Sequence, residues 1–202
     1  MARSLLASAA IMPLMQPRER PLVVTKHDVS WQAFEDFLVR RGDALPRVTY
    51  LDGVLELMSP TYDHETIRRR FADVLEAYLD HLGIEWEGVG HWTLKQAPNA
   101  GLEPDECYIL RNISRRTPDL AVEVVWKSGG IDKLEIYRRL GVGEVWFWID
   151  EVVTIWVLRD GGYVRVDESE AAPGIDFSIL PEMLALPSQS AVRKALRARY
   201  AK

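Results

Sequence analysis

The sequence has 202 residues, of which 48% are hydrophobic, and its 25 basic and 30 acidic side chains give a net charge of −5. This length and apolar content fit one folded domain and exclude disorder as the main state, while the acidic balance excludes a protein that coats nucleic acid through bulk positive charge. A single cysteine, Cys107, excludes an internal disulfide framework, and no apolar run reaches the roughly 18 residues of a membrane span, so a cytoplasmic protein is expected.

The N-terminal residues 1–27 are expected to form a flexible segment, followed by a single domain over residues 28–202. One arginine precedes a short apolar stretch, as in a secretion signal, but Pro13 interrupts the stretch that would have to follow. An upstream start codon with a flexible N-terminus is the simpler interpretation, because Met12 and Met15 offer alternative starts.

Apolar residues at helical spacing predict a short helix over residues 28–40 and a longer one over residues 63–82, with Asp63 as its N-cap. Between these helices, two apolar strands flank the dipeptide Asp52-Gly53, whose residues favour the positive φ of a tight turn. This pattern predicts a hairpin over residues 48–60.

The second half of the chain alternates strands with a helix. Residues 117–126 and 144–150 predict two buried strands, and residues 130–141 predict a helix between them, which together are typical of a parallel βαβ unit. A further hairpin is predicted over residues 152–166, and a basic helix ends the chain. These elements favour an α/β (α+β) fold, with a mixed central β-sheet flanked by helices.

A carboxylate interrupts the first of these buried strands. Glu123 lies between two valines, on a strand whose other face carries Leu120, Val122 and Val124. An unpaired buried charge costs several kcal/mol, so this side chain must be ion-paired, bound to a metal or protonated. A purely structural ion pair with a lysine or arginine explains the position as well as a functional site does.

A second carboxylate precedes a neighbouring strand. Asp105 follows Pro104 at the start of the stretch ECYIL. Carboxylates on two neighbouring strands form the kind of open, oxygen-rich site in which Mg²⁺ binds together with phosphate and water. Lys133, in the helix after Glu123, can stabilise charge on a phosphate or orient a water beside such a site.

These residues resemble the PD-(D/E)XK nuclease superfamily, which has the restriction-endonuclease-like fold. Within it, the chain is similar to the Uma-type family of bacterial restriction-endonuclease-like proteins. The segments that carry the resemblance occur in order over residues 48–150: YLDGVLELMSP, DHE at the start of a helix, PDECYIL, PDLAVEV and KLEIYRRLGVGEVWFWID.

The resemblance implies a magnesium- or manganese-dependent endonuclease that hydrolyses DNA phosphodiester bonds, expected as a homodimer. By position, Asp105 and Glu123 match the metal-binding acids, and a main-chain carbonyl near Val124 would complete the site. Lys133 matches a catalytic lysine that has moved from the strand into the following helix. Lys127 is the competing lysine, because it lies closer to Glu123 in sequence.

Other positions have both functional and structural interpretations. Glu65 opens the long helix where similar nucleases add an acid to the metal site, although the structural interpretation, an exposed first-turn acid next to the helix dipole, is slightly favoured. Arg115, Arg116 and Arg68 are expected to form a basic rim that contacts phosphate. The alternatives to a DNA endonuclease are a non-catalytic nucleic-acid- or protein-binding module that keeps the fold, and a metal-dependent hydrolase of another phosphodiester.

Overall fold

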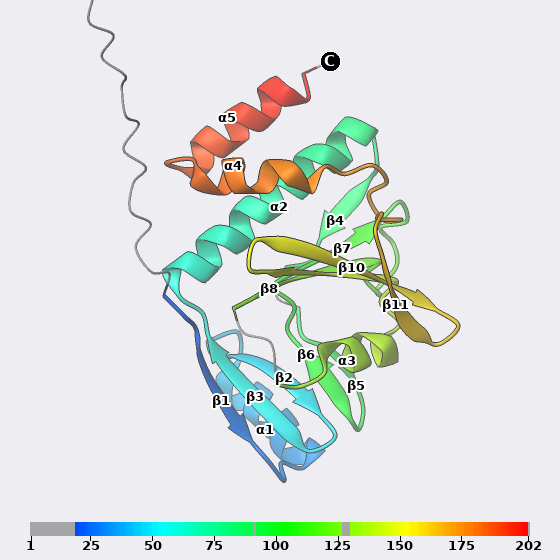
Figure 1. Ribbon diagram of the computed structural model, residues 1–202. Coiled ribbons are helices and arrows are strands. Elements are labelled where there is room, and N and C mark those ends of the chain that lie inside the picture. Colours follow the sequence, from blue (N-terminus) through cyan, green and yellow to red (C-terminus); the bar gives the residue numbers. More distant parts are fainter. Residues whose placement is uncertain (1–18, 91, 127–129, 202) are drawn as a thin grey trace, which may run out of the picture.

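Two β-sheets lie side by side in the computed structural model, which describes residues 19–90, 92–126 and 130–201 (Figure 1). The smaller sheet has five antiparallel strands in the order β1-β3-β2-β6-β5. Its strands are β1 (Leu22–Lys26), β2 (Arg47–Leu51), β3 (Val54–Ser59), β5 (Leu94–Gln96) and β6 (Ala100–Leu102).

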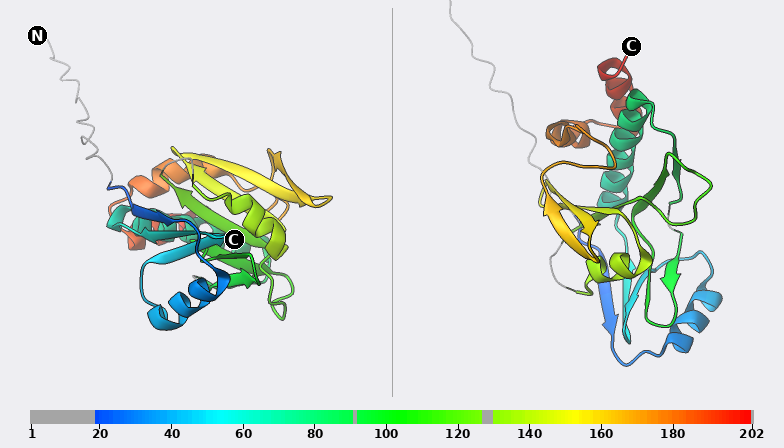
Figure 2. Two further views of the ribbon diagram at one scale, coloured as in Figure 1. Left: turned by 90° about the horizontal axis from the view of Figure 1, so that it is seen from below. Right: turned by 90° about the vertical axis from the view of Figure 1, so that its right-hand side faces the viewer.

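Helix α1 (Trp31–Arg41) packs on this smaller sheet. The side chain of Ser30 accepts a hydrogen bond from the N–H of Ala33 at 3.2 Å and so begins the helix. Phe34 is fully buried and stacks on Tyr50 of β2, with ring centroids 4.7 Å apart. Figure 2 shows α1 at the opposite end of the molecule from the C-terminal helices.

The larger sheet is mixed and has six strands in the order β11-β10-β9-β8-β7-β4. Its strands are β4 (Trp86–Gly88), β7 (Glu106–Leu110), β8 (Leu120–Val125), β9 (Glu144–Ile149), β10 (Val152–Arg159) and β11 (Gly162–Val166). Only the β8–β9 pair is parallel among these, and α3 (Lys133–Leu140) connects its two strands. The predicted βαβ unit and both predicted hairpins are therefore confirmed.

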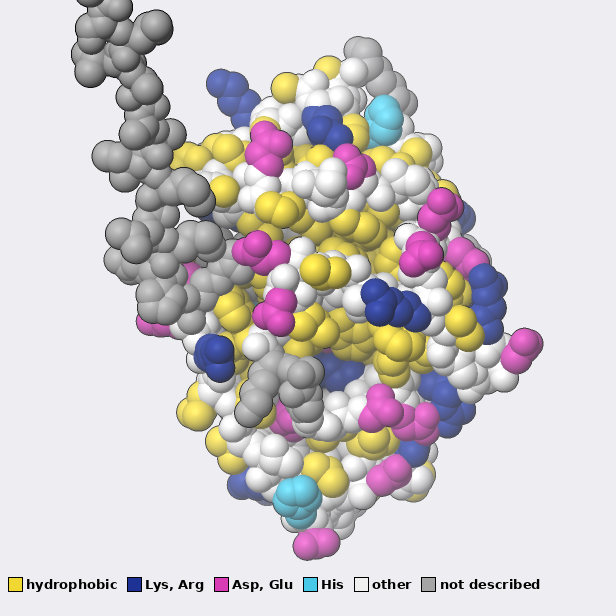
Figure 3. Space-filling view, viewed as in Figure 1, with side chains coloured by type: hydrophobic (Ala, Val, Ile, Leu, Met, Phe, Trp, Pro, Cys, Tyr) yellow, Lys and Arg dark blue, Asp and Glu magenta, His cyan; other side chains and the backbone are white. Residues whose placement is uncertain are grey.

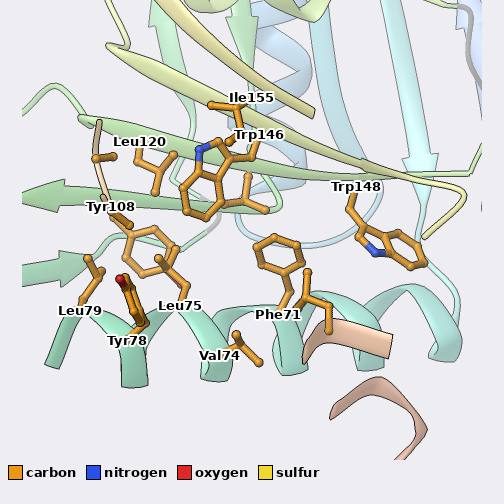
Figure 4. Packing of buried hydrophobic residues seen from close by; sticks show 14 of the residues in the cluster. Phe71, Val74, Leu75, Tyr78, Leu79, Tyr108, Leu120, Trp146, Trp148 and Ile155 are labelled. Atoms are coloured by element: carbon orange, nitrogen blue, oxygen red, sulfur yellow. The ribbon is translucent and has the colours of Figure 1, made fainter. Parts of the chain in front are cut away.

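Helix α2 (Tyr62–Leu82) supplies the main core against one face of the larger sheet. Its apolar stripe, including Phe71 and Leu75, packs against Trp146 and Trp148 of β9 (Figure 4). Helices α4 (Leu180–Ala185) and α5 (Gln189–Arg199) pack against the outer side of α2, after a short 3-10 helix, η1 (Phe177–Ile179). Helix α3 buries Ile136 and Tyr137 in a second core, with residues from the opposite face of the sheet.

Three expectations need correction. Residues 22–26, within the segment expected to be flexible, form β1, which pairs with β3 along its whole length. The predicted mixed sheet is present, but the β2–β3 hairpin belongs to a second sheet that the sequence did not indicate. The N-cap of α2 is Thr61 rather than Asp63, because the Thr61 hydroxyl accepts the hydrogen bond from the N–H of His64. No helix among the described residues is long and apolar enough to span a membrane.

Candidate active site

A cavity of 1120 Å³ lies between the two sheets. Strands β1, β2 and β3 contribute to one side of it, while β8, β9 and β10 contribute to the other. The first residues of α2 and α3 also reach it, as His64 and Lys133. Polar groups from both sheets thus meet at one place, although they are far apart in the sequence.

Asp105 is almost completely buried at the edge of this cavity, immediately before β7. Its Oδ2 accepts a hydrogen bond from the N–H of Val124 at 2.8 Å, which ties it to β8. Its Oδ1 pairs with the guanidinium of Arg47, and its Oδ2 also lies 3.2 Å from Nε2 of His64. Burial acts to raise the pKa of Asp105, but the hydrogen bond and charge of His64 and the charge of Arg47 outweigh it, so the pKa is held well below its usual range.

Glu123 is completely buried in the middle of β8, where helix α3 supplies both of its partners. Lys133 Nζ lies 2.7 Å from Glu123 Oε2, and the hydroxyl of Tyr137 donates a hydrogen bond to Oε1. Burial and the negative charge of Asp105 raise the pKa of Glu123 in spite of Lys133. The two carboxylates raise the pKa of Lys133 against the effect of burial, so the ammonium stays charged.

Arg47 and His64 connect Asp105 to Glu65 in the first turn of α2. Arg47 Nη2 lies 2.6 Å from Glu65 Oε1, while its other amino group contacts Asp105. Glu65 Oε2 also pairs with Arg68 at 2.8 Å. Although burial opposes the change, the hydrogen bond from His64 and the charges of Arg47 and Arg68 lower the pKa of Glu65 to about 2.

His64 is buried, and its Nε2 lies 3.2 Å both from Asp105 Oδ2 and from the carbonyl oxygen of Val124. Burial acts to lower the pKa of His64, but hydrogen bonds to Asp105 and Glu65 outweigh it and raise the pKa to about 9. The imidazolium therefore bridges Oδ2 of Asp105, just before β7, and the carbonyl oxygen of Val124 in β8. These are also two of the oxygens expected to bind a metal ion.

The donor chemistry at this place fits a hard divalent cation. Two buried carboxylates and a main-chain carbonyl are the oxygen ligands that Mg²⁺ prefers. Within the described ranges, no group of three or more His, Cys, Asp or Glu side chains is arranged to hold a metal. The groups that would hold the cation are Asp105, Glu123 and the Val124 carbonyl, and Arg47, His64 and Lys133 balance the charge of the two carboxylates.

Comparison with known protein families identifies the family of this chain. Residues 31–189 match the Uma2 family model, whose description is "putative restriction endonuclease". The chain belongs to the Uma2 family. The matched residues include every acid and lysine discussed above, and both sheets except β1. No curated protein matches the chain.

A solved structure confirms the fold of this Uma2 family member. A "putative nuclease belonging to DUF820" from Anabaena variabilis matches with a TM-score of 0.52 and 14% sequence identity. The match covers 83% of this chain and 99% of the other. At this identity the similarity establishes a shared fold.

The structure brings together most of the site residues that were proposed from the sequence of this Uma2 family member. Lys133 contacts Glu123, whereas Lys127 lies outside the described residues. The expected rim is different, because Arg115 pairs with Asp119 at 2.6 Å and Arg68 pairs with Glu65. The basic groups that line the cavity are instead Arg20, Arg47, His64 and Lys133.

Sequence reasoning missed Arg47 and Tyr137. Arg47 is buried, with only 5% of its surface exposed, and it is the only charged residue of its strand, which is the same signal that identified Glu123. Tyr137 lies four residues after Lys133, so helical spacing puts both side chains on the same face of α3. His64 is also buried, and this burial could not be read from the sequence.

Proposed function

We propose that this protein is a divalent-metal-dependent endonuclease that hydrolyses DNA phosphodiester bonds. The observation that carries the proposal is the pair of buried carboxylates, Asp105 and Glu123, at neighbouring strands beside a cavity, with Lys133 bonded to one of them. The Lys133 side chain keeps 23% of its surface exposed, so it faces both the buried acid and the cavity.

In this proposal Asp105, Glu123 and the carbonyl of Val124 hold Mg²⁺ or Mn²⁺. When bound, the cation would supply a water of lowered pKa and neutralise charge on the phosphate. Lys133 would exchange its contact with Glu123 for one with a phosphate oxygen, or orient the attacking water. Tyr137 would keep Glu123 in place by donating to its other oxygen.

Glu65 was expected as a further metal ligand. Its two oxygens contact Arg47 and Arg68, so it would have to give up at least one of these contacts to bind a metal ion. We therefore propose that Glu65 acts indirectly, because it shares Arg47 with Asp105 and so orients the metal-binding carboxylate. His64 would have to leave its position between Asp105 and Val124 before these oxygens could both bind a cation.

The alternative is a binding module that keeps the fold and uses the same residues as structural ion pairs. The present contacts of Asp105 and Glu123 satisfy both carboxylates without a metal, which is the specific observation in its favour. An assay of nuclease activity distinguishes the two proposals.

A homodimer, which would present two such sites to the two strands of DNA, is a further proposal that sedimentation can test.

The test is nicking of supercoiled plasmid in Mg²⁺ or Mn²⁺, compared with the same reaction in EDTA. The wild type should nick only with the metal, while Glu123→Gln and Lys133→Met should each reduce the rate by at least about a hundredfold, the scale of one lost charge-stabilising group. No nicking in any divalent metal would favour the binding module.

The chain offers a matched control for these substitutions. Lys95 and Glu35 form an exposed ion pair of the same type and length, 2.7 Å, away from the cavity. Lys95→Met and Glu35→Gln should therefore leave nicking unchanged. Equal losses in both pairs would indicate a general effect on folding and would contradict the proposed roles.

A further inference from the structure

The sheet face that carries Glu123 continues into the cavity as an apolar surface. In the parallel β8–β9 pair Glu123 is opposite Phe147, and in the antiparallel β9–β10 pair Phe147 is opposite Thr154. Paired residues point to the same face of a sheet, so these three side chains form one row that starts at the buried acid. Phe147, Thr154 and their neighbours Ile149 and Trp156 all line the cavity.

These side chains are only partly buried. Phe147, Ile149 and Trp156 keep part of their surface exposed, although the strands on which they lie are central in the sheet. Ile149 and Trp156 lie outside the three hydrophobic clusters formed by the described residues. Trp156 Nε1 donates to Thr154 Oγ1 at 3.3 Å, which fixes the indole on the sheet. Their apolar faces are therefore turned to the cavity.

The other side of the cavity also carries apolar side chains, among polar ones such as Thr25, Thr49 and Glu56. Leu22 and Val23 of β1 are 66% and 47% exposed, and Met58 of the adjacent strand lines the cavity with them. Hydrophobic side chains are visible across the middle of the molecule in Figure 3, between the helical end and the smaller sheet. Large exposed apolar surfaces in a monomer are unusual and mark binding sites.

A duplex presents phosphates and groove edges, because its bases are stacked inside. It would gain little from an apolar wall of this kind. An unpaired nucleotide presents both a flat base, which stacks on aromatic side chains, and a phosphate, which seeks cations. The cavity offers both types of surface next to each other, with Phe147 and Trp156 on the wall and Arg47 and Lys133 at the buried acids. Its volume of 1120 Å³ is large enough for a small organic ligand.

We propose that this cavity accepts an unpaired DNA nucleotide, either from a single strand or from a bulge, with its base against Phe147 and Trp156 and its phosphate beside Lys133. This inference rests on the proposed function, since it specifies the substrate of the same site. It predicts that strand separation or extrusion of a base precedes cleavage.

The experiment measures binding by fluorescence anisotropy with three labelled oligonucleotides of one sequence: a single strand, a perfect duplex and a duplex with a bulge. Titrations in Ca²⁺ supply a hard cation for the carboxylates, and gels run afterwards check that each oligonucleotide is intact. The single strand and the bulged duplex should bind at least about tenfold more tightly than the perfect duplex. Trp156→Ala should weaken binding of the single strand by about fivefold or more, the scale of one lost stacking contact.

Three further variants make the result specific. Trp156→Phe keeps an aromatic surface and should restore most of the affinity, whereas Phe147→Leu keeps an apolar side chain and should not preserve the preference for unpaired DNA. Trp92 is 43% exposed but does not line the cavity, so Trp92→Ala is the matched control and should change nothing. Melting temperatures identify any variant that fails to fold. If Trp156→Ala fails to fold, Phe147→Leu provides the test instead.

The outcomes separate this inference from the proposed function. Equal binding of duplex and single strand, unchanged by Trp156→Ala and Phe147→Leu, would overturn the inference and leave metal-dependent nicking unaffected. Preferred binding of unpaired DNA without cleavage in any divalent metal would support the nucleotide site and overturn the hydrolysis. A protein that binds none of the three oligonucleotides would contradict both.

Discussion

Lys133 Nζ lies 2.7 Å from Glu123 Oε2 and so joins the first residue of α3 to the centre of β8. Tyr137, one helical turn later, binds the other oxygen of the same carboxylate. A completely buried acid is therefore held by one short helix of eight residues, and any movement of that helix moves its partners. The position of α3 is thus as important for the site as the acid itself.

Tyr137→Phe should destabilise the protein, because it removes a hydrogen bond to a buried charged group. Such bonds contribute about 1.5–3 kcal/mol. Tyr163 is the matched control, since its hydroxyl donates to the neutral carbonyl of Val142 at 2.5 Å. Tyr163→Phe should cost only about 0.5–1.5 kcal/mol. Urea unfolding of both variants checks the order, and a larger loss for Tyr163→Phe would contradict the account of Glu123.

Arg47→Met should be among the most destabilising single substitutions, because it removes one of the two cations, with His64, that Asp105 and Glu65 share. Removal of one member of a buried ion pair costs about 3–5 kcal/mol. Arg115 forms an exposed pair with Asp119, and such pairs contribute at most about 1 kcal/mol, so Arg115→Met is the control. Similar unfolding free energies for the two variants would show that the Arg47 network contributes little.

The position of α3 depends on Arg139, which reaches across to the other sheet. Its two amino groups bind the carboxylate of Asp52 in the β2–β3 turn at 2.7 Å each, while its Nε binds Glu135. The hydrogen bond from Arg139 lowers the pKa of Asp52, and hydrogen bonds from Arg138 and Arg139 lower that of Glu135 to about 2. Both carboxylates are therefore easier to ionise in the folded protein than in the unfolded chain.

This arrangement predicts a specific loss of stability in acid. A carboxyl whose pKa is lower in the folded state stabilises the fold above its ordinary pKa, 4.5 for Glu135, and this contribution disappears as the pH falls toward about 2. Arg139→Met should make the free energy of unfolding less dependent on pH over that interval. Arg159→Met, which breaks an exposed pair with Glu170, is the control. Identical pH profiles for Arg139→Met and wild type would exclude the proposed link.

Much of the fold could be predicted because its signals are local. The apolar stripe of α2, the Asp52-Gly53 turn and the alternation of β8 each occupy one continuous stretch of sequence. The division into two sheets could not be predicted, because it depends on the pairing of β2 with β6, which lies some fifty residues away along the chain. Strand β1 was not predicted, because all five of its residues are exposed and form no buried face.

In the candidate site, too, contacts between residues far apart in the sequence could not be predicted. Glu123 and Lys133 are ten residues apart, and the helix that follows the strand along the chain brings them together. Arg47 begins a strand of the smaller sheet, and Asp105, 58 residues later, precedes a strand of the larger one, so only the complete fold reveals their contact. Separation in the sequence therefore explains why Arg47 was not predicted, but not Tyr137, which lies only 14 residues from Glu123.

A crystal structure of the wild type grown in Mn²⁺, with an anomalous difference map, tests the central claim most directly. The account predicts an anomalous peak about 2.1 Å from oxygens of Asp105, Glu123 and the Val124 carbonyl, the bond length typical of a small hard cation. It also predicts that His64 has moved away from Asp105 and that Lys133 has released Glu123. A map without such a peak, in which His64 still contacts Asp105 and Lys133 still contacts Glu123, would contradict a metal-dependent site.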